Sequence, residues 1–87
     1  KPIINIHPSL LPKYKGLDTH YRAIKNGDKF SGATVHIVNE KMDSGKIILQ
    51  EKIKILKSDT EKSLEKKVLK IEHRIYSKAI IKLLTTY

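Results

Sequence analysis

The alternation of apolar and polar residues predicts three β-strands in this chain. The first, residues 2–7 (PIINIH), is β-branched and apolar up to Asn5 and is expected to end near His7. The second, residues 33–38 (ATVHIV), alternates with a period of two. The third, residues 46–55, places a set of aliphatic side chains on one face: Ile47, Leu49, Ile53 and Ile55. Because a short polar connection joins the last two strands, we expect them to pair antiparallel.

Two helices are predicted from helical spacing and from the signals at their ends. Residues 19–25 are expected to form a short helix that Asn26-Gly27 ends. The last third of the chain has apolar residues at a helical period, with the lysines largely on other faces. These apolar residues are Leu64, Val68, Ile71, Ile75, Ala79 and Leu83. Ser58 and Glu61 have the spacing of a capping box, which predicts that this helix begins just after Ser58.

The predicted order of elements is strand, helix, strand, strand, helix, which places residues 1–87 in the α/β class as a single unit. Three short strands make a sheet that is small for independent stability. The first strand begins at Lys1 with neither a turn nor a cap before it. We therefore expect the chain to be the C-terminal part of a longer protein, with the missing part upstream.

Composition narrows the classes of function. The absence of cysteine excludes disulfides, thiolate chemistry and cysteine zinc sites. No apolar run is long enough to cross a bilayer and no signal-peptide pattern opens the chain, which favours a cytoplasmic location. The net charge of +9 comes mostly from lysines spread along the chain, with few arginines and few aromatic residues. A small basic RNA-binding module is therefore the weaker alternative, and the charge would equally steer anionic small substrates.

Asn5, His7 and Asp43 are the candidates for chemistry. Asn5 and His7 lie two apart in a strand, so they project from one face near its carboxyl end, where open α/β sheets bind ligands. An amide donor beside an imidazole can stabilise a developing oxyanion and move a proton. Asp43 lies in the loop after the second predicted strand, and a carboxylate near His7 would favour the imidazolium. Two alternatives stay open: a structural Asn–His pair, and a carboxylate that only forms a turn.

The remaining titratable residues give weaker indications. His20, His36 and His73 lack metal-ligand spacing with one another or with His7, so no metal site is predicted. The chain also has no glycine-rich phosphate loop and no Gly-x-Ser-x-Gly nucleophile turn. Glu72 interrupts the apolar pattern of the last helix, where an exposed glutamate is ordinarily solvated.

Three strings carry a specific resemblance. INIHPSLLPKYKGLDTHYRAIKNGD, GATVHIVNEKMDSGKIILQ and EHRIY resemble, in order and spacing, the phosphoribosylglycinamide formyltransferases of purine biosynthesis. The match runs from Ile3 to about Tyr76 and is almost ungapped. It implies that the chain is the C-terminal catalytic half of a formyltransferase-type open mixed β-sheet flanked by helices. The N-terminal half of the same chain, which holds the substrate phosphate in that family, would be its missing partner, and this half alone is expected to be inactive.

The resemblance implies transfer of a formyl group from 10-formyltetrahydrofolate to the amine of glycinamide ribonucleotide. Asn5 would donate a hydrogen bond to the oxyanion that forms when the amine attacks. Protonated His7 would stabilise that oxyanion and donate a proton, while Asp43 would keep His7 protonated and order a relay water. Pro8 would orient His7. No metal and no covalent intermediate are expected.

The resemblance also implies two binding sets. Folate binding is assigned to Asn5 and to the loop Asn39, Glu40, Lys41, Met42 and Asp43. Binding of the sugar of the substrate is assigned to Glu72, with Leu69, Lys70 and Ile71 in the same helical turn. Within the match, the segment from Met42 to Lys46 replaces a commoner Leu-Asp-Gly-Gly-Pro.

Two relatives of the same fold are the enzyme alternatives. Methionyl-tRNA formyltransferases usually continue Gly-Ala-Ala-Pro after the leucine pair, where this chain has Gly16-Leu17-Asp18-Thr19-His20. Formyltetrahydrofolate hydrolases tend to have His-His-Ser-Phe-Leu-Pro where this chain has HPSLLP at residues 7–12. Both comparisons favour the purine enzyme.

Overall fold

A computed structural model of the chain describes residues 3–86. Its elements follow the predicted order: β1 (Ile4–His7), α1 (Thr19–Lys25), β2 (Phe30–Ile37), β3 (Ile47–Lys54) and α2 (Glu61–Thr86). Lys1 and Pro2, where the first strand was predicted to begin, lie outside the described residues. No helix within residues 3–86 is long and apolar enough to span a membrane.

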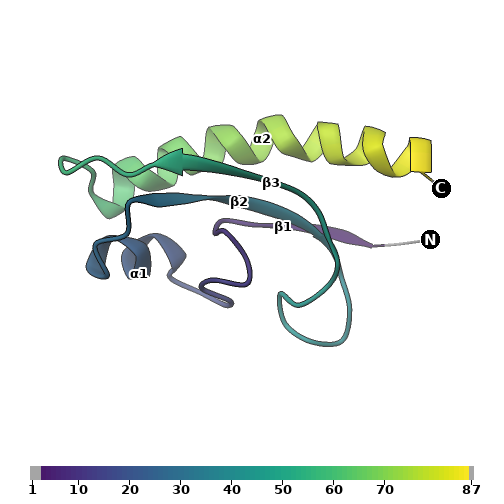
Figure 1. Ribbon diagram of the computed structural model, residues 1–87, viewed down its shortest axis with the longest axis horizontal. Coiled ribbons are helices and arrows are strands. Elements are labelled where there is room, and N and C mark those ends of the chain that lie inside the picture. Colours follow the sequence, from purple (N-terminus) through teal and green to yellow (C-terminus); the bar gives the residue numbers. More distant parts are fainter. Residues whose placement is uncertain (1–2, 87) are drawn as a thin grey trace.

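The sheet has the strand order β1-β2-β3, and both pairings are antiparallel. Antiparallel pairing of β2 with β3 confirms the prediction. The expected mixed sheet is not seen among the described residues, since neither pairing in residues 3–86 is parallel. The connection from β1 to β2, residues 8–29, is long and contains α1, yet it brings β2 back antiparallel to β1. Helix α2 runs along one face of the sheet, while the loops that follow β1 and β2 extend on the opposite side (Figure 1).

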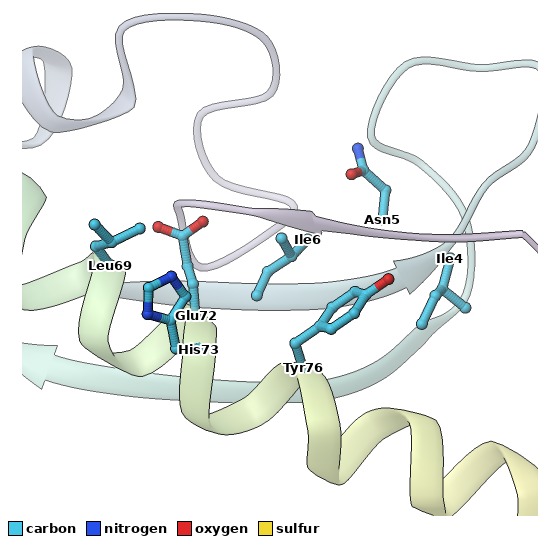
Figure 2. Close-up of a pocket in the computed structure, with 7 residues that line it drawn as sticks. All are labelled: Ile4, Asn5, Ile6, Leu69, Glu72, His73 and Tyr76. Carbon is cyan, nitrogen blue, oxygen red and sulfur yellow. The ribbon is translucent and has the colours of Figure 1, made fainter.

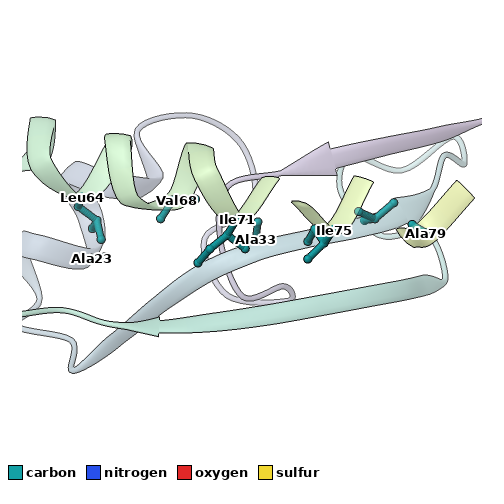
Figure 3. Close-up of a cluster of buried hydrophobic side chains, with 8 residues drawn as sticks. Ala23, Ala33, Leu64, Val68, Ile71, Ile75 and Ala79 are labelled. Atoms are coloured by element: carbon teal, nitrogen blue, oxygen red, sulfur yellow. The ribbon is translucent and has the colours of Figure 1, made fainter. Parts of the chain in front are cut away.

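The apolar stripe of α2 packs on the sheet as predicted, except for Leu83, which is only partly buried and lies outside the core. Leu64, Val68, Ile71, Ile75 and Ala79 are all buried against Ala33 and Val35 of β2 and Ala23 of α1, as Figure 3 shows for the labelled residues. Each fully buried aliphatic side chain of this kind stabilises a fold by about 1.5–3 kcal/mol. This layer fixes β1 and β2, and therefore the residues that project from their other face.

Two local predictions are wrong. The capping box of α2 is formed by Thr60 and Ser63, not by Ser58 and Glu61: Ser63 N–H donates to Thr60 Oγ1 at 3.2 Å, and Thr60 N–H donates to Ser63 Oγ at 2.8 Å. Ser63 thus fills the reciprocal position that glutamate takes in the usual motif. The second wrong prediction concerns β3: Ile47 was expected on the apolar face with Leu49, Ile53 and Ile55, but its side chain is 42% exposed.

The exposure of Ile47 has its cause in a β-bulge. Val35 pairs with Leu49 but His36 pairs with Ile47, so Ile48 is an extra residue in β3. The bulge reverses the alternation at the start of the strand, and Ile48 packs against the core in place of Ile47.

Strand β2 begins three residues before its predicted start at Ala33. Gly32, which weakens a strand prediction, is required there, because an added Cβ would lie 2.1 Å from the Glu51 carbonyl oxygen. The close approach of β3 therefore explains a glycine that the sequence pattern alone interprets as a loop residue.

Candidate active site

Asn5 and His7 lie on one face of β1, as predicted. The antiparallel register places His36 beside Asn5 and Thr34 beside His7, so four polar side chains share this face. Ile4 and Ile6 take the opposite face, toward α2, and Figure 2 shows Asn5 pointing away from that helix. The Asn5 side chain is exposed, and no hydrogen bond from another residue of the described range engages its carboxamide.

His7 and Asp43 are brought together, although 36 positions separate them in the sequence (43 − 7). His7 Nδ1 lies 3.4 Å from Asp43 Oδ2, and both side chains are largely buried. Asp43 has a left-handed backbone with φ of 50°, and its Oδ2 also accepts a hydrogen bond from Gly16 N–H at 2.8 Å. The carboxylate is therefore held by the first loop while it faces the imidazole.

The second ring nitrogen of His7 is also engaged. Nε2 donates a hydrogen bond of 2.8 Å to the main-chain carbonyl of Tyr14, which can only accept. A carbonyl at Nε2 and a carboxylate at Nδ1 give the ring two acceptors. An imidazolium can donate to both at once, whereas a neutral imidazole can donate to only one.

The loop between β1 and α1 is anchored over the sheet by Thr34. Its buried hydroxyl donates to the Ser9 carbonyl at 2.7 Å and accepts from Leu11 N–H at 3.1 Å. Gln50 of β3 also donates to this hydroxyl, at 2.8 Å. The loop is thus attached to the central strand immediately beside His7.

His36 is a site residue that sequence reasoning missed. Its ring is buried, with Nε2 3.7 Å from Asp43 Oδ1 and Nδ1 3.3 Å from the Ile37 carbonyl. Asp43 therefore lies between two histidines. The signal was present in the ATVHIV pattern, but it becomes readable only once the register places His36 beside Asn5.

The predicted folate loop lies next to Asp43 but is otherwise open. Its first four residues, Asn39, Glu40, Lys41 and Met42, are exposed. Lys41 N–H donates to Asn39 Oδ1 at 3.0 Å, which makes a tight turn. The loop ends at Gly45, where an added Cβ would lie 1.4 Å from the Ile37 carbonyl oxygen. No alternative residue fits there without moving β2 or the loop, so the return of the chain fixes Asp43.

A pocket of about 630 Å³ lies between β1 and α2 (Figure 2). It brings two of the four predicted sugar-binding residues, Leu69 and Glu72, to the strand that carries Asn5. Burial raises the pKa of the Glu72 carboxyl, and electrostatic interactions with His73 and His7 oppose that shift. The other two do not line this pocket: Lys70 is exposed, and Ile71 is buried in the core. The binding roles of these residues stay predictions.

A second pocket, of about 320 Å³, has His7 in its wall. Its wall includes His20 of α1 and the carboxylates Glu61 and Glu65 of α2, none of which the sequence analysis selected. Burial lowers the pKa of His20 despite the two nearby carboxylates, and its Nδ1 has no hydrogen-bond partner among residues 3–86. Only the packing of α1 on α2 brings these residues to His7.

Comparisons with known proteins agree with this geometry and confirm the resemblance. The profile of the Formyl transferase family matches residues 1–80. The phosphoribosylglycinamide formyltransferase of Haemophilus influenzae is 51% identical over 74 residues, which are 85% of this chain and 35% of that protein. The crystal structure of the enzyme of the same name from Bacillus halodurans matches with a TM-score of 0.89 at 46% identity, covering 93% of this chain and 42% of that one.

A second solved structure, of phosphoribosylglycinamide formyltransferase from Brucella melitensis, matches with a TM-score of 0.86 at 49% identity over 92% of this chain and 41% of that one. The chain spans about a third of the length of the first curated relatives that it matches. Because the family profile covers nearly all of the sequence and the solved relatives share its fold, the chain belongs to the formyl transferase family.

Proposed function

We propose that this chain carries the catalytic residues for transfer of a formyl group from 10-formyltetrahydrofolate to the amine of glycinamide ribonucleotide. The observation that carries the proposal is the position of His7. Its ring lies between the Asp43 carboxylate and the Tyr14 carbonyl, and His7 follows Asn5 by two positions on the same face of β1. The names of two similar relatives support the choice of acceptor. Residues upstream would complete the site, and a cytoplasmic location stays a prediction.

The two contacts of the His7 ring differ, which suggests a division of labour between its nitrogens. The Nε2 contact of 2.8 Å has normal hydrogen-bond length, whereas the Nδ1 contact of 3.4 Å is long for a charge-assisted bond. Nε2 would therefore orient the ring, and Nδ1 would be the donor that exchanges its contact with Asp43 for the developing oxyanion. The nearby carboxylate stabilises the positive ring during that exchange.

The reaction then proceeds in two steps. The amine nitrogen attacks the formyl carbon, and the carbonyl electron pair moves to oxygen, where the Asn5 carboxamide and His7 Nδ1–H stabilise it. The intermediate then collapses: the bond from carbon to the folate nitrogen breaks, that nitrogen takes a proton, and the former amine loses one. His7 supplies the first proton, and a water held by Asp43 accepts the second. We propose no role for a metal ion in either step of the reaction.

The binding surfaces follow from the same geometry. The loop from Asn39 to Asp43 would offer main-chain groups to the folate, since the side chains of its first four residues are exposed and its turn is closed by Asn39. Glu72, in the pocket beside β1, would accept hydrogen bonds from the sugar hydroxyls. Burial raises the pKa of Glu72 because it disfavours the ionised carboxylate. Hydrogen bonds from the sugar hydroxyls would stabilise that ionised form.

The test is a formyl-transfer assay on the complete gene product with three acceptors: glycinamide ribonucleotide, water and methionyl-tRNA. Transfer to glycinamide ribonucleotide that is lost in the His7→Ala variant supports the proposal. Formate release in water or transfer to methionyl-tRNA instead would assign the chain to a different activity of the same fold. Tight RNA binding that weakens steeply with salt and ignores Asp43 would favour the RNA-binding alternative.

A further inference from the structure

The loop after β1 holds Tyr14 in an unusual backbone conformation. Its φ is 57°, in the left-handed region that bulky residues rarely adopt. This conformation aims the Tyr14 carbonyl at His7 Nε2, 2.8 Å away, and the same oxygen lies 3.4 Å from Ser9 Oγ. A strained residue of this kind persists only where surrounding contacts over-determine it. The side chain of Tyr14 supplies such contacts.

The Tyr14 hydroxyl is fixed by the turn that follows α1. It donates to Asp28 Oδ2 at 2.6 Å and accepts from Asn26 Nδ2 at 2.7 Å. Lys13 binds the same carboxylate oxygen at 3.0 Å, and this ion pair raises the pKa of Lys13. Two consecutive loop residues are therefore attached to one carboxylate, which is 13% exposed.

Arg22 of α1 secures the loop on the other side of Tyr14. Its guanidinium donates to the carbonyls of Lys15 at 2.7 Å and of Leu17 at 3.0 Å. The same group lies 5.0 Å from the centre of the Tyr14 ring, within the range of a cation–π contact. Gly16, within the segment so fixed, donates the N–H that binds Asp43.

We propose that Tyr14 is a positioning residue for the reaction: its hydroxyl, bound by Asp28 and Asn26, holds the main-chain carbonyl that orients His7. This inference rests on the proposed function of His7, and it adds a role for a side chain that touches no reacting atom. The loop from Tyr14 to Gly16 then positions both partners of the His7 ring. The Tyr14 carbonyl binds Nε2, and the Gly16 N–H holds the Asp43 carboxylate that faces Nδ1.

Tyr14→Phe in the complete gene product tests this, since it removes the hydroxyl and keeps the ring. We expect kcat for formyl transfer to fall on the order of tenfold with KM for the folate little changed, because small displacements of a catalytic group are costly. Tyr21→Phe is the matched control: Tyr21 is half exposed on α1, and within residues 3–86 its hydroxyl meets only Lys25, at 3.4 Å. Equal kcat in Tyr14→Phe and in wild type would overturn the proposal.

A double-mutant cycle separates positioning from general weakening of the loop. Asp28→Ala removes the acceptor of the Tyr14 hydroxyl, so Asp28→Ala combined with Tyr14→Phe should be no slower than the slower single variant. Multiplied effects of the two single substitutions would contradict a shared action on His7. If Tyr14→Phe does not fold, Asn26→Ala, which removes only the second contact of the hydroxyl, takes its place with the same expectations.

Nitrogen-15 spectra of the histidine rings distinguish failure of this inference from failure of the proposed function. Neutral His7 should carry its proton on Nε2 in wild type and in Tyr21→Phe, and should exchange between both tautomers in Tyr14→Phe. His7→Gln identifies its signals by their absence. An unchanged His7 spectrum in Tyr14→Phe overturns the positioning role even if the wild-type protein transfers formyl groups. A changed spectrum in a protein without formyl transfer keeps that role and rejects the reaction.

Discussion

Replacing Asp43 by asparagine removes the charge that faces His7 while keeping the shape of the side chain. The asparagine oxygen can still accept from Gly16 N–H, and asparagine tolerates the left-handed backbone at this position at least as well as aspartate. We therefore expect Asp43→Asn to fold with near wild-type stability. The change isolates the electrostatic contribution of the carboxylate to the positive form of the ring.

The size of that contribution follows from the 3.4 Å between Asp43 Oδ2 and His7 Nδ1. Two unit charges at this distance attract by about 1 kcal/mol in bulk water and by about 5 kcal/mol at the effective dielectric of a protein surface. The carboxylate is 11% exposed, so its environment lies between these limits. Since about 1.4 kcal/mol is tenfold in rate, kcat should fall on the order of 10²-fold.

The assay is the steady-state rate of formyl transfer by the complete gene product across pH 5–9. Asp43→Asn should lower kcat at every pH in this range, because the carboxylate that faces His7 Nδ1 is gone. Glu51→Gln, which neutralises a carboxylate on β3 that pairs with Arg74, is the matched control and should keep wild-type kcat. A wild-type rate and pH profile in Asp43→Asn would refute the catalytic role of this carboxylate.

Three further outcomes are expected. His7→Ala should abolish measurable turnover while folate binding, followed by calorimetry, stays within a few-fold of wild type; loss of the fold would instead identify a structural histidine. Gly45→Ala should lower the urea midpoint far more than Gly27→Ala, since the first meets main chain at 1.4 Å and the second meets no atom within 4 Å and costs only the left-handed backbone, about 1 kcal/mol. Hydrogen bonds, of which the one from Lys67 has the largest effect, lower the pKa of Asp59 from 3.8 to about 2. Asp59 therefore stabilises the fold above pH 4, and this contribution is lost as pH falls through about 2. Asp59→Asn should therefore be less stable than wild type at pH 6 and nearly equal to it near pH 2 in urea unfolding, and a constant difference across that range would contradict the assignment.

Local sequence signals predict much of the fold. Helix α1 has its predicted bounds, because Asn26-Gly27 ends it with a left-handed glycine whatever the rest of the chain does. The buried stripe of α2 follows from period alone, since each of its residues must face the sheet once the helix packs there.

The failures come from interactions between strands. The bulge that turns Ile47 outward is a property of the β2–β3 register and leaves no trace in β3 itself. The early start of β2 is hidden by Gly32, which is selected by the close approach of Glu51. The residue pattern of one strand contains no information on its pairing partner, so neither the bulge nor the approach of Glu51 to Gly32 can be predicted from it.

The site divides in the same way. Asn5 and His7 are predicted on one face of β1, because the period of a strand is two. Asp43 is a candidate from its place in the loop after β2, but only the family resemblance favours it over a residue that merely forms a turn. His36 required the register, and the Tyr14 carbonyl required the loop conformation, since a main-chain acceptor has no side-chain signature. His20, Glu61 and Glu65 required the docking of α1 on α2. What sequence cannot supply is therefore mainly the surroundings of His7.

We propose that His7, held beside Asp43, serves formyl transfer to an amine. The most direct measurement is the rate of tetrahydrofolate release by the complete gene product with 10-formyltetrahydrofolate, with and without glycinamide ribonucleotide, for wild type and for His7→Ala. We expect acceptor-dependent release that disappears in His7→Ala while the variant remains folded. Release that does not depend on the acceptor, or that persists in the folded His7→Ala variant, would contradict it.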